Sequence, residues 1–330
     1  MNIYKKLQSR YTLFGYNSDI TRMLNKATTT NLKGFAILVV MLGHLVNIHR
    51  STFDYDFRYF AAFAVSIFLI LSGYGLSCSC SSNGLKDFFK KRLSGVILPY
   101  ALVTIMVSIA YGILFTDPLR VLRTITLTNP LHPIDGTMWF IYFICMWYIL
   151  FFISYSLTKN KSFRVLSIAA IATFIYYWHP FEQFPQLNFQ FTLHAFSFAA
   201  GVIIGEYKDK ISFKILLPIS TVIFIFSLHD LFNEYSMLSY EVSCLSFGIL
   251  ITSLFSILKI DTPSLSFFGS ISYEMYLFEG VLLGVSYNQS NIINALMFVF
   301  FTTATAYLFK KGLITSKARY TEILNKHVRT

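Results

Sequence analysis

Ten apolar segments separated by short polar loops dominate this chain of 330 residues. A helix needs roughly 17 to 25 apolar residues to cross about 30 Å of hydrocarbon. Only 13% of the residues are charged and 55% are hydrophobic, whereas soluble domains carry about 25% charged residues. The sequence therefore predicts an all-α, polytopic membrane helix bundle of about ten transmembrane helices. The predicted spans lie near residues 32–49, 57–77, 95–115, 137–157, 163–178, 190–206, 214–229, 237–257, 265–286 and 291–309.

Lysine and arginine are distributed unevenly between the two sides of these spans. When residues at span ends are counted with the nearest loop, 23 of the 27 lie on the side of the N-terminal tail. The other side holds Arg50, Arg58, Arg120 and Arg123. Because basic loops face the cytoplasm, both termini are expected there. The net charge of +11 is thus a topology signal, and we expect no nucleic-acid partner.

The even number of spans divides the chain into three parts. Residues 1–31 and 310–330 are expected to be cytoplasmic tails, and residues 32–309 to form one ten-helix membrane domain. The remaining loops average about ten residues once bilayer thickness has set the span lengths. No separate domain outside the membrane is therefore expected.

The first span carries the most informative polar side chains. Lys33 lies at its cytoplasmic end and His44 eleven residues later, which is about three helical turns, or roughly 16 Å. Both side chains are therefore expected on one face of the helix. Ionisable groups inside membranes are functional by default, and imidazole exchanges protons near neutral pH. The alternatives are that His44 only bonds a neighbouring helix and that Lys33 only marks the cytoplasmic side.

Five motifs in order resemble a known family of membrane proteins. Their residues are Lys33 to His44, the aromatic second span ending in Ser72-Gly73, Lys90-Lys91-Arg92 before Pro99-Tyr100, Met138-Trp139-Phe140, and Ile271-Ser272-Tyr273-Glu274-Met275-Tyr276-Leu277. This pattern is similar to that of the acyltransferase-3 integral-membrane acyltransferases, of the surface polysaccharide O-acetyltransferase type. The resemblance extends from about residue 32 to 309.

Two positions depart from the family pattern. A second cation usually lies near the proline of the third span, where this chain has Ser94-Gly95-Val96. Many members also have a histidine two residues after the late Tyr-Leu segment, where this chain has Phe278-Glu279. The role of that late histidine therefore cannot be transferred to this chain.

The resemblance implies transfer of an acetyl group from cytoplasmic acetyl-CoA to a hydroxyl of a surface polysaccharide or lipid-linked glycan. It also implies a multi-pass protein of the plasma membrane, bacterial inner or cytoplasmic, surrounded by membrane lipid and without a permanently bound cofactor. Lys33, Arg92 and Lys91 are the expected donor-binding residues, since basic groups attract the phosphates of coenzyme A. For Lys90 and Lys91 a pure topology role is the alternative.

The chemistry implied for His44 has two forms. It is either a general base for the acceptor hydroxyl or a nucleophile that forms a transient acyl-histidine. Glu279 is the second catalytic candidate, because a carboxylate can orient an imidazole. Trp139, Tyr273 and Tyr276 are the expected substrate-binding residues, since aromatic faces suit sugar rings, although aromatic belts also occur at membrane interfaces.

Two other interpretations of the function remain open. A proton-coupled transporter or flippase would use His44, Glu274 and Glu279 as a proton relay. An assembly partner of a glycan-synthesis complex would need no activity of its own. For His194 we expect a contact between helices. No histidine pair has the i, i+4 spacing of a helical metal site, so no metal is expected.

Overall fold

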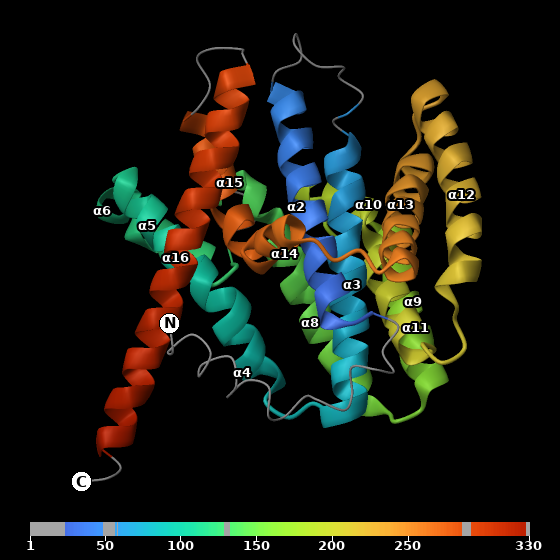
Figure 1. Cartoon of the computed structure of the whole chain (residues 1–330), viewed down its shortest axis with the longest axis horizontal. Coiled ribbons are helices and arrows are strands. Elements are labelled where there is room, and N and C mark those ends of the chain that lie inside the picture. Colours follow the sequence, from blue (N-terminus) through green and yellow to red (C-terminus); the bar gives the residue numbers. More distant parts are fainter. Residues whose placement is uncertain (1–23, 49–56, 58, 129–132, 286–291, 328–330) are drawn as a thin grey trace.

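The computed structural model describes residues 24–48, 57, 59–128, 133–285 and 292–327, and within them all regular elements are helical (Figure 1). In a helix the backbone N–H and C=O groups form hydrogen bonds with each other, and hydrocarbon offers these groups no other partner. The predicted all-α membrane bundle is therefore confirmed. Its elements are α2 (Lys26–Ile48), α3 (Tyr59–Asn83), α4 (Phe88–Arg92), the π-helix Leu93–Ile97, α5 (Leu98–Ala110), α6 (Ile113–Thr116), α7 (Pro118–Ile125), the 3₁₀ turn Gly136–Met138, α8 (Trp139–Leu157), α9 (Lys161–Trp178), α10 (Pro185–Leu193), α11 (Ala195–Glu206), α12 (Phe213–Asn233), α13 (Met237–Leu258), α14 (Pro263–Ser270), α15 (Ser272–Val285) and α16 (Ile292–His327).

Eight helical segments in the described ranges are long and apolar enough to cross a membrane. They are Lys26–Val46, Tyr59–Asn83, Phe88–Ala110, Gly136–Leu157, Pro185–Glu206, Phe213–Asn233, Met237–Leu258 and Ile293–Ser316. The predicted spans at 163–178 and 265–286 are not among them. The first of these is α9, an 18-residue helix that has Lys161 and Arg164 in its first turn. The second, the predicted span 265–286, is divided between two helices, α14 and α15.

The interruption in the predicted ninth span lies at Ile271, between α14 and α15. Ile271 has φ −115° and ψ 9°, so the helix stops and restarts at this residue. A similar break lies at His194, between α10 and α11. Irregular backbone at membrane depth is tolerated where protein buries it or where it lines a cavity. The two breaks are therefore candidate positions for the wall of a functional cavity.

The helices at the two ends of the predicted membrane domain, α2 and α16, extend beyond its predicted boundaries. Helix α2 begins at Lys26 rather than near residue 32, and α16 continues to His327. Most of the predicted C-terminal tail is therefore helical. Residues 1–23 of the predicted N-terminal tail lie outside the described residues.

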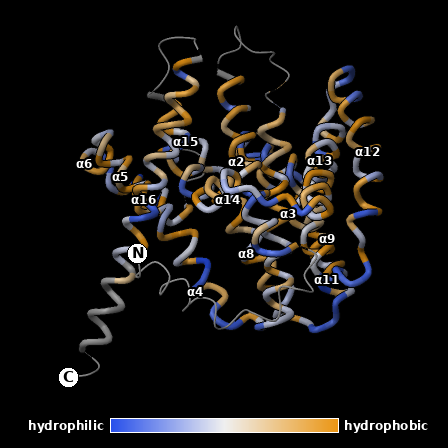
Figure 2. The backbone as a smooth tube through the Cα atoms, in the orientation of Figure 1, coloured by the Kyte–Doolittle hydropathy of each residue, from blue (hydrophilic) through white to orange (hydrophobic). Residues whose placement is uncertain are grey.

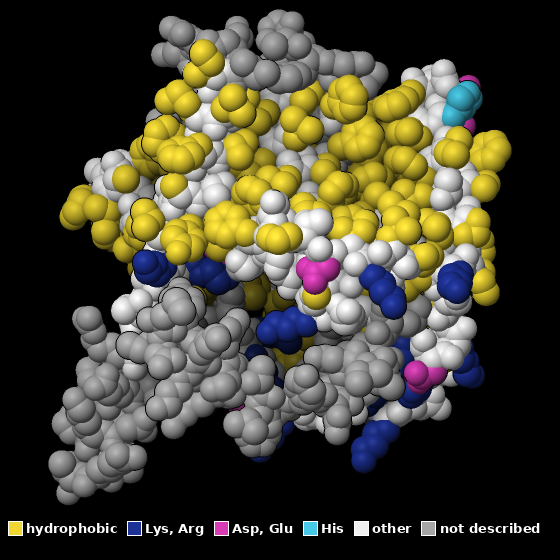
Figure 3. Space-filling model, in the orientation of Figure 1, with side chains coloured by type: hydrophobic (Ala, Val, Ile, Leu, Met, Phe, Trp, Pro, Cys, Tyr) yellow, Lys and Arg dark blue, Asp and Glu magenta, His cyan; other side chains and the backbone are white. Residues whose placement is uncertain are grey.

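The surface distribution of side chains is that of a membrane protein. Hydrophobic residues follow the helices, and hydrophilic residues gather at α4 and at the lower loops (Figure 2). On the face shown in Figure 3, hydrophobic side chains form a broad belt, and Lys and Arg lie along and below its lower edge. The chain is a multi-pass membrane protein. The lower side is the one that the charge distribution assigns to the cytoplasm.

Helix α3 forms the centre of the bundle, and α2, α11 and α13 pack against it. On the other side of α2 lies the short helix α14, which two glycines allow to approach closely. A Cβ on Gly34 would lie 2.0 Å from the carbonyl oxygen of Leu265, and one on Gly269 would lie 1.8 Å from that of Thr30. Backbone therefore packs on backbone at this crossing, beside Lys33.

Asn31 fixes the start of α14 against α2. Its side-chain amide donates to Asp261 Oδ1 at 2.9 Å, and its Oδ1 accepts the backbone N–H of Thr262 at 2.9 Å. Thr262 in turn caps α14 by accepting the N–H of Leu265. The start of α14 and the end of α2 that carries Lys33 are thus held together.

The glycine crossing predicts a stability effect. We expect Gly34→Ala to lower the free energy of unfolding by about 1–3 kcal/mol, because the added methyl group must push the α14 backbone away. Gly312→Ala is the matched control, since a Cβ on Gly312 in α16 meets nothing within 4 Å. This control should be neutral or more stable by up to about 1 kcal/mol, because alanine favours helix. Thermal unfolding of the two detergent-solubilised variants checks the difference, and equal melting temperatures would contradict it.

Candidate active site

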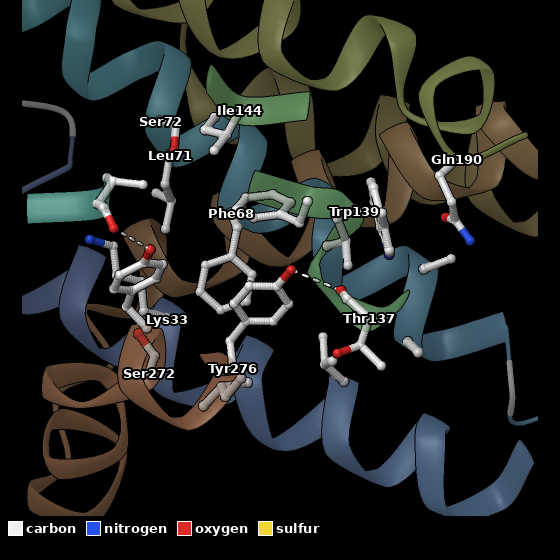
Figure 4. A pocket seen from close by; sticks show the side chains of 18 of the residues that line it. Lys33, Phe68, Leu71, Ser72, Thr137, Trp139, Ile144, Gln190, Ser272 and Tyr276 are labelled. Atoms are coloured by element: carbon white, nitrogen blue, oxygen red, sulfur yellow. Dashed lines mark hydrogen bonds between the residues drawn. The ribbon is translucent and has the colours of Figure 1, made fainter. Parts of the chain in front are cut away.

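A cavity of about 1080 Å³ runs through the bundle from the end of α2 that carries Lys33 to His44. Its walls come from α2, α3, the α4–α5 segment, α8, α10, α13, α15 and α16. Figure 4 shows Lys33 and Ser272 at one end, and Thr137, Trp139 and Gln190 at the other. Lys33 and His44 thus lie on one face of α2, as their spacing predicts. The cavity connects the basic end of the helix with the buried imidazole.

Three cationic side chains from three segments line the cavity at its basic end. They are Lys33 of α2, Arg92 at the end of α4 and Lys310 of α16. The guanidinium carbon of Arg92 lies 5.5 Å from the ring centre of Phe88 and 5.2 Å from that of Tyr148. Stacking of this kind restrains the guanidinium without neutralising its charge. Within the described part of the chain, neither Lys33 nor Arg92 forms an ion pair, so both charges remain available to an anion.

The π-helix after Arg92 also contributes to the wall of the cavity. Gly95 and Val96 line it, and the hydroxyl of Tyr273 donates to the carbonyl oxygen of Val96 at 2.8 Å. A π-helical turn disrupts the regular pattern of helical hydrogen bonds and is frequent at functional sites. Tyr273, two residues after the break at Ile271, therefore links α15 to the entrance of the third span.

His44 is paired with a carboxylate at the deep end of the cavity. Its Nδ1 lies 2.6 Å from Oε1 of Glu279 on α15. The side chain of His44 is 33% exposed, and that of Glu279 only 2%. An ionised carboxylate only accepts hydrogen bonds, so a neutral imidazole paired with ionised Glu279 would carry its hydrogen on Nδ1 and keep the lone pair of Nε2. This arrangement prepares the imidazole either to accept a proton or to attack an electrophile.

A second carboxylate, Asp135, lies beside this pair. Its Oδ1 accepts from the backbone N–H of Thr137 at 2.8 Å and from the Thr137 hydroxyl at 2.7 Å, which caps the turn before α8. A Cβ on Gly280, the residue after Glu279, would lie 2.6 Å from Asp135 Oδ2. Glycine at position 280 therefore lets the Asp135 turn pack against α15. The hydroxyl of Tyr276 bonds the same turn, donating to the carbonyl oxygen of Thr137 at 2.8 Å.

A second cavity of about 680 Å³ also reaches His44. It shares His44, Thr137, Trp139, Phe189 and Gln190 with the large cavity. The rest of its wall comes mostly from residues near the starts of α8 and α10. It is formed by Pro133, Gly136, Tyr142, Pro185, Gln186, Leu187 and Leu283. His44 is therefore accessible from two directions, one lined by cations and the other by amide, aromatic and apolar side chains.

Comparison with known families identifies the chain. A family model described as an acyltransferase domain matches residues 30–309. The chain belongs to the acyltransferase-3 family. It is therefore a membrane acyltransferase, and the residues that line the two cavities lie in the matched region, except for Lys310, which directly follows it. No curated protein and no solved structure matches the acyltransferase.

The structure brings together most of the residues predicted from the sequence. The large cavity of the acyltransferase is lined by six of them, namely Lys33, His44, Arg92, Trp139, Tyr273 and Tyr276. Glu279 contacts the imidazole of His44. Lys91 is not brought to the site. Its side chain is exposed on α4, its ammonium donates to the carbonyl oxygen of Lys86, and it lines neither cavity. The topology role considered for Lys91 fits this position.

His194 forms contacts between helices, as expected. It is fully buried, its ring stacks on Trp139 at 5.5 Å between centres, and its Nδ1 lies 3.3 Å from the hydroxyl oxygen of Ser66. Because Trp139 lines both cavities, His194 helps to fix an indole that lies at the His44 end of the large cavity.

Three residues of the site were missed by reasoning from the sequence, namely Lys310, Asp135 and Gln190. Lys310 looks like the first charge of a cytoplasmic tail, and Asp135 looks like a residue of a short loop. The Asp-Gly-Thr turn before Trp139 was a usable signal for Asp135, since it predicts a side-chain cap. No local pattern marks Lys310 or Gln190, because tertiary packing brings them to the cavity.

Proposed function

We propose that this acyltransferase moves an acetyl group from cytoplasmic acetyl-CoA to a hydroxyl of an exported or lipid-linked surface glycan. The observation that carries the proposal is the single cavity that joins Lys33, Arg92 and Lys310 to His44. Coenzyme A has anionic phosphates at one end and its thioester at the end of a long flexible arm. The cations would hold the phosphates, while the arm would bring the thioester up to the imidazole.

The second cavity supports a separate approach for the acceptor. It reaches His44 from the other direction, and among the described residues that line it His44 is the sole ionisable side chain apart from the phenol of Tyr142. Gln186 and Gln190 offer amides, and Trp139 offers an aromatic face, the types of group that bind sugars. A hydroxyl entering there would meet the thioester at His44.

The reaction needs one proton acceptor at this meeting point. As the acceptor hydroxyl attacks the thioester carbonyl, its proton passes to Nε2 of His44, a C–O bond forms and the C–S bond breaks. The departing thiolate of coenzyme A then takes the proton from His44, so atoms and charges balance. Glu279 stabilises the imidazolium between these two steps.

The second route uses the same residues in a different order. Nε2 of His44 attacks the thioester carbonyl, a C–N bond forms, the C–S bond breaks, and coenzyme A leaves as a thiolate. The acceptor hydroxyl then attacks the acyl carbon of the acyl-histidine, a C–O bond forms, the C–N bond breaks, and the hydroxyl proton goes to the thiolate. A quenched reaction with labelled donor and no acceptor separates the routes. Stoichiometric label on the protein indicates acyl-histidine, and its absence indicates direct transfer.

The proposal predicts acetyl transfer by the purified protein in lipid vesicles. With labelled acetyl-CoA and a panel of oligosaccharides and polyprenyl-linked sugars, we expect label to appear in a glycan as an alkali-labile ester. Vesicles without protein are the control. Absence of glycan label over the whole panel, with coenzyme A bound, would reject the glycan acceptor. Proton-coupled movement of a glycan or lipid precursor without acetyl transfer would favour the transporter interpretation.

A further inference from the structure

Lys310 lies in the wall of the large cavity although it is 218 residues from Arg92 and 277 residues from Lys33 along the chain. It is carried by α16, which packs against α15. The third span lacks a second cation between Arg92 and Pro99, since Ser94, Gly95 and Val96 are uncharged. A cation from the last helix lies at the same end of the cavity instead.

The contacts of Lys310 hold its ammonium in place at the cavity wall. Its Nζ donates to Oε2 of Glu274 at 3.1 Å and to the carbonyl oxygen of Ser270. Ser270 is the last residue of α14, just before the break at Ile271, so this carbonyl is not needed within a continuous helix. An ammonium group has three N–H donors, and these described contacts use two of them. A third donor therefore remains for a ligand in the cavity.

The charge balance at this end of the cavity favours a polyanion. Lys33, Arg92 and Lys310 contribute three positive charges, and Glu274 is the acidic residue among the described side chains that line the cavity. Glu274 is 9% exposed and Lys310 is 32% exposed, so the carboxylate is the more buried partner. Like charges in one cavity repel each other, and an anion between them adds an attraction that offsets this repulsion. A ligand with several phosphate oxygens would offset this repulsion.

We propose that Lys310 is a third phosphate-binding residue of the donor site, positioned by Glu274 and by the end of α14. The inference rests on the proposed function, because it takes the donor to be an acyl thioester of coenzyme A. The competing explanation is that the Lys310–Glu274 pair only ties α16 to α15. The two explanations differ in which donors and which variants they affect.

The first test compares two donors with Lys310→Gln. Acetyl-CoA carries the phosphates, and S-acetylpantetheine carries the same thioester without them. We expect Lys310→Gln to raise the KM for acetyl-CoA about tenfold, the effect of losing one charge-assisted hydrogen bond, with kcat nearly unchanged. The KM for S-acetylpantetheine should not change. Lys311→Gln is the matched control, because Lys311 is the exposed neighbour and lines neither cavity.

The second test uses the partner of Lys310. Glu274→Gln removes the negative charge but keeps an amide oxygen that can still accept from the Lys310 ammonium. The ammonium therefore stays in position with its charge no longer offset, and the affinity for coenzyme A should increase. Lys310→Arg should retain the KM of the wild type. If Glu274→Gln and Lys310→Gln raise the KM for acetyl-CoA and the KM for S-acetylpantetheine equally, the Lys310–Glu274 pair only connects α16 to α15. The inference is then wrong.

Direct binding separates this inference from the proposed function. Calorimetry of coenzyme A with the purified protein in detergent gives the dissociation constant without any acceptor. Wild-type protein that does not bind coenzyme A would overturn both the proposed donor and the role of Lys310. Wild-type and Lys310→Gln proteins that bind it with equal affinity would overturn the role of Lys310 alone. Weaker binding by Lys310→Gln, with an unchanged melting temperature, is the result we expect.

Discussion

Replacing His44 with glutamine should lower kcat for acetyl transfer by about 10²–10⁴-fold, the range of general acid–base catalysis. Glutamine is similar in size and polar, so it can occupy the cavity wall and still bond Glu279. It has no lone pair of suitable basicity, however, and cannot form an acyl intermediate. Both chemical routes therefore stop at this substitution. The measurement is the initial rate of label transfer from acetyl-CoA to the acceptor in vesicles.

The control for this variant is another histidine of the same chain. His229→Gln changes a side chain near the end of α12 that is 73% exposed and lines neither cavity. Its transfer rate should equal that of the wild type. The His44 variant should also keep the wild-type affinity for coenzyme A, because the basic end of the cavity is unchanged. A His44→Gln protein that binds the donor and transfers acetyl groups at the wild-type rate would remove His44 from the mechanism.

The sequence alone predicts the membrane bundle because lipid imposes a strong and simple constraint. Long apolar runs must become helices, and basic loops indicate the cytoplasmic side. The common face of Lys33 and His44 follows from helical geometry, since eleven residues make about three turns. These predictions need no knowledge of which helices are neighbours. The overall fold and one wall of the site could therefore be predicted.

The breaks in the spans could not be located from hydropathy. Ser270, Ser272 and Glu274 lie around Ile271, but the apolar residues on both sides make the segment resemble one continuous span. Packing against α2 through Gly34 and Gly269 nevertheless holds α14 as a separate short helix. The break has a consequence for the site. It frees the carbonyl of Ser270 for Lys310 and directs Tyr273 to the π-helix. Only tertiary packing determines such features.

Partners from distant helices were equally difficult to predict. The sequence makes Glu279 a candidate to orient the His44 imidazole, but it does not show that these two side chains, 235 residues apart, come within hydrogen-bond distance. In the sequence, Lys310 looks like a tail residue and Asp135 like a loop residue. Each becomes part of the site through long-range packing of α16 or of the turn before α8. Spacing along one helix can be derived from the sequence, whereas contacts between helices become visible only in the tertiary structure.

Replacing Glu279 with glutamine is the second change for which we expect a large effect, a fall in kcat of about 10²–10⁴-fold, as for a carboxylate that orients a catalytic histidine. The amide of glutamine can donate to Nδ1, which would place the ring hydrogen on Nε2 and leave no lone pair facing the substrates. It also removes the negative charge that stabilises the imidazolium. Since Glu279 lies behind His44, the KM for acetyl-CoA should stay near its wild-type value.

Glu241→Gln is the matched control, because Glu241 is also a buried carboxylate within a span but accepts the backbone N–H of Phe196 and has no contact with His44. Its amide oxygen can keep that bond, so its transfer rate should remain close to the wild-type rate. Glu279→Asp should recover part of the lost rate, since it restores the charge with a shorter reach. A purely structural role would instead raise the KM, lower the melting temperature and give no recovery with aspartate. Parallel losses in Glu279→Gln and Glu241→Gln would mean that burial of the carboxylate, and not its contact with the imidazole, is what matters.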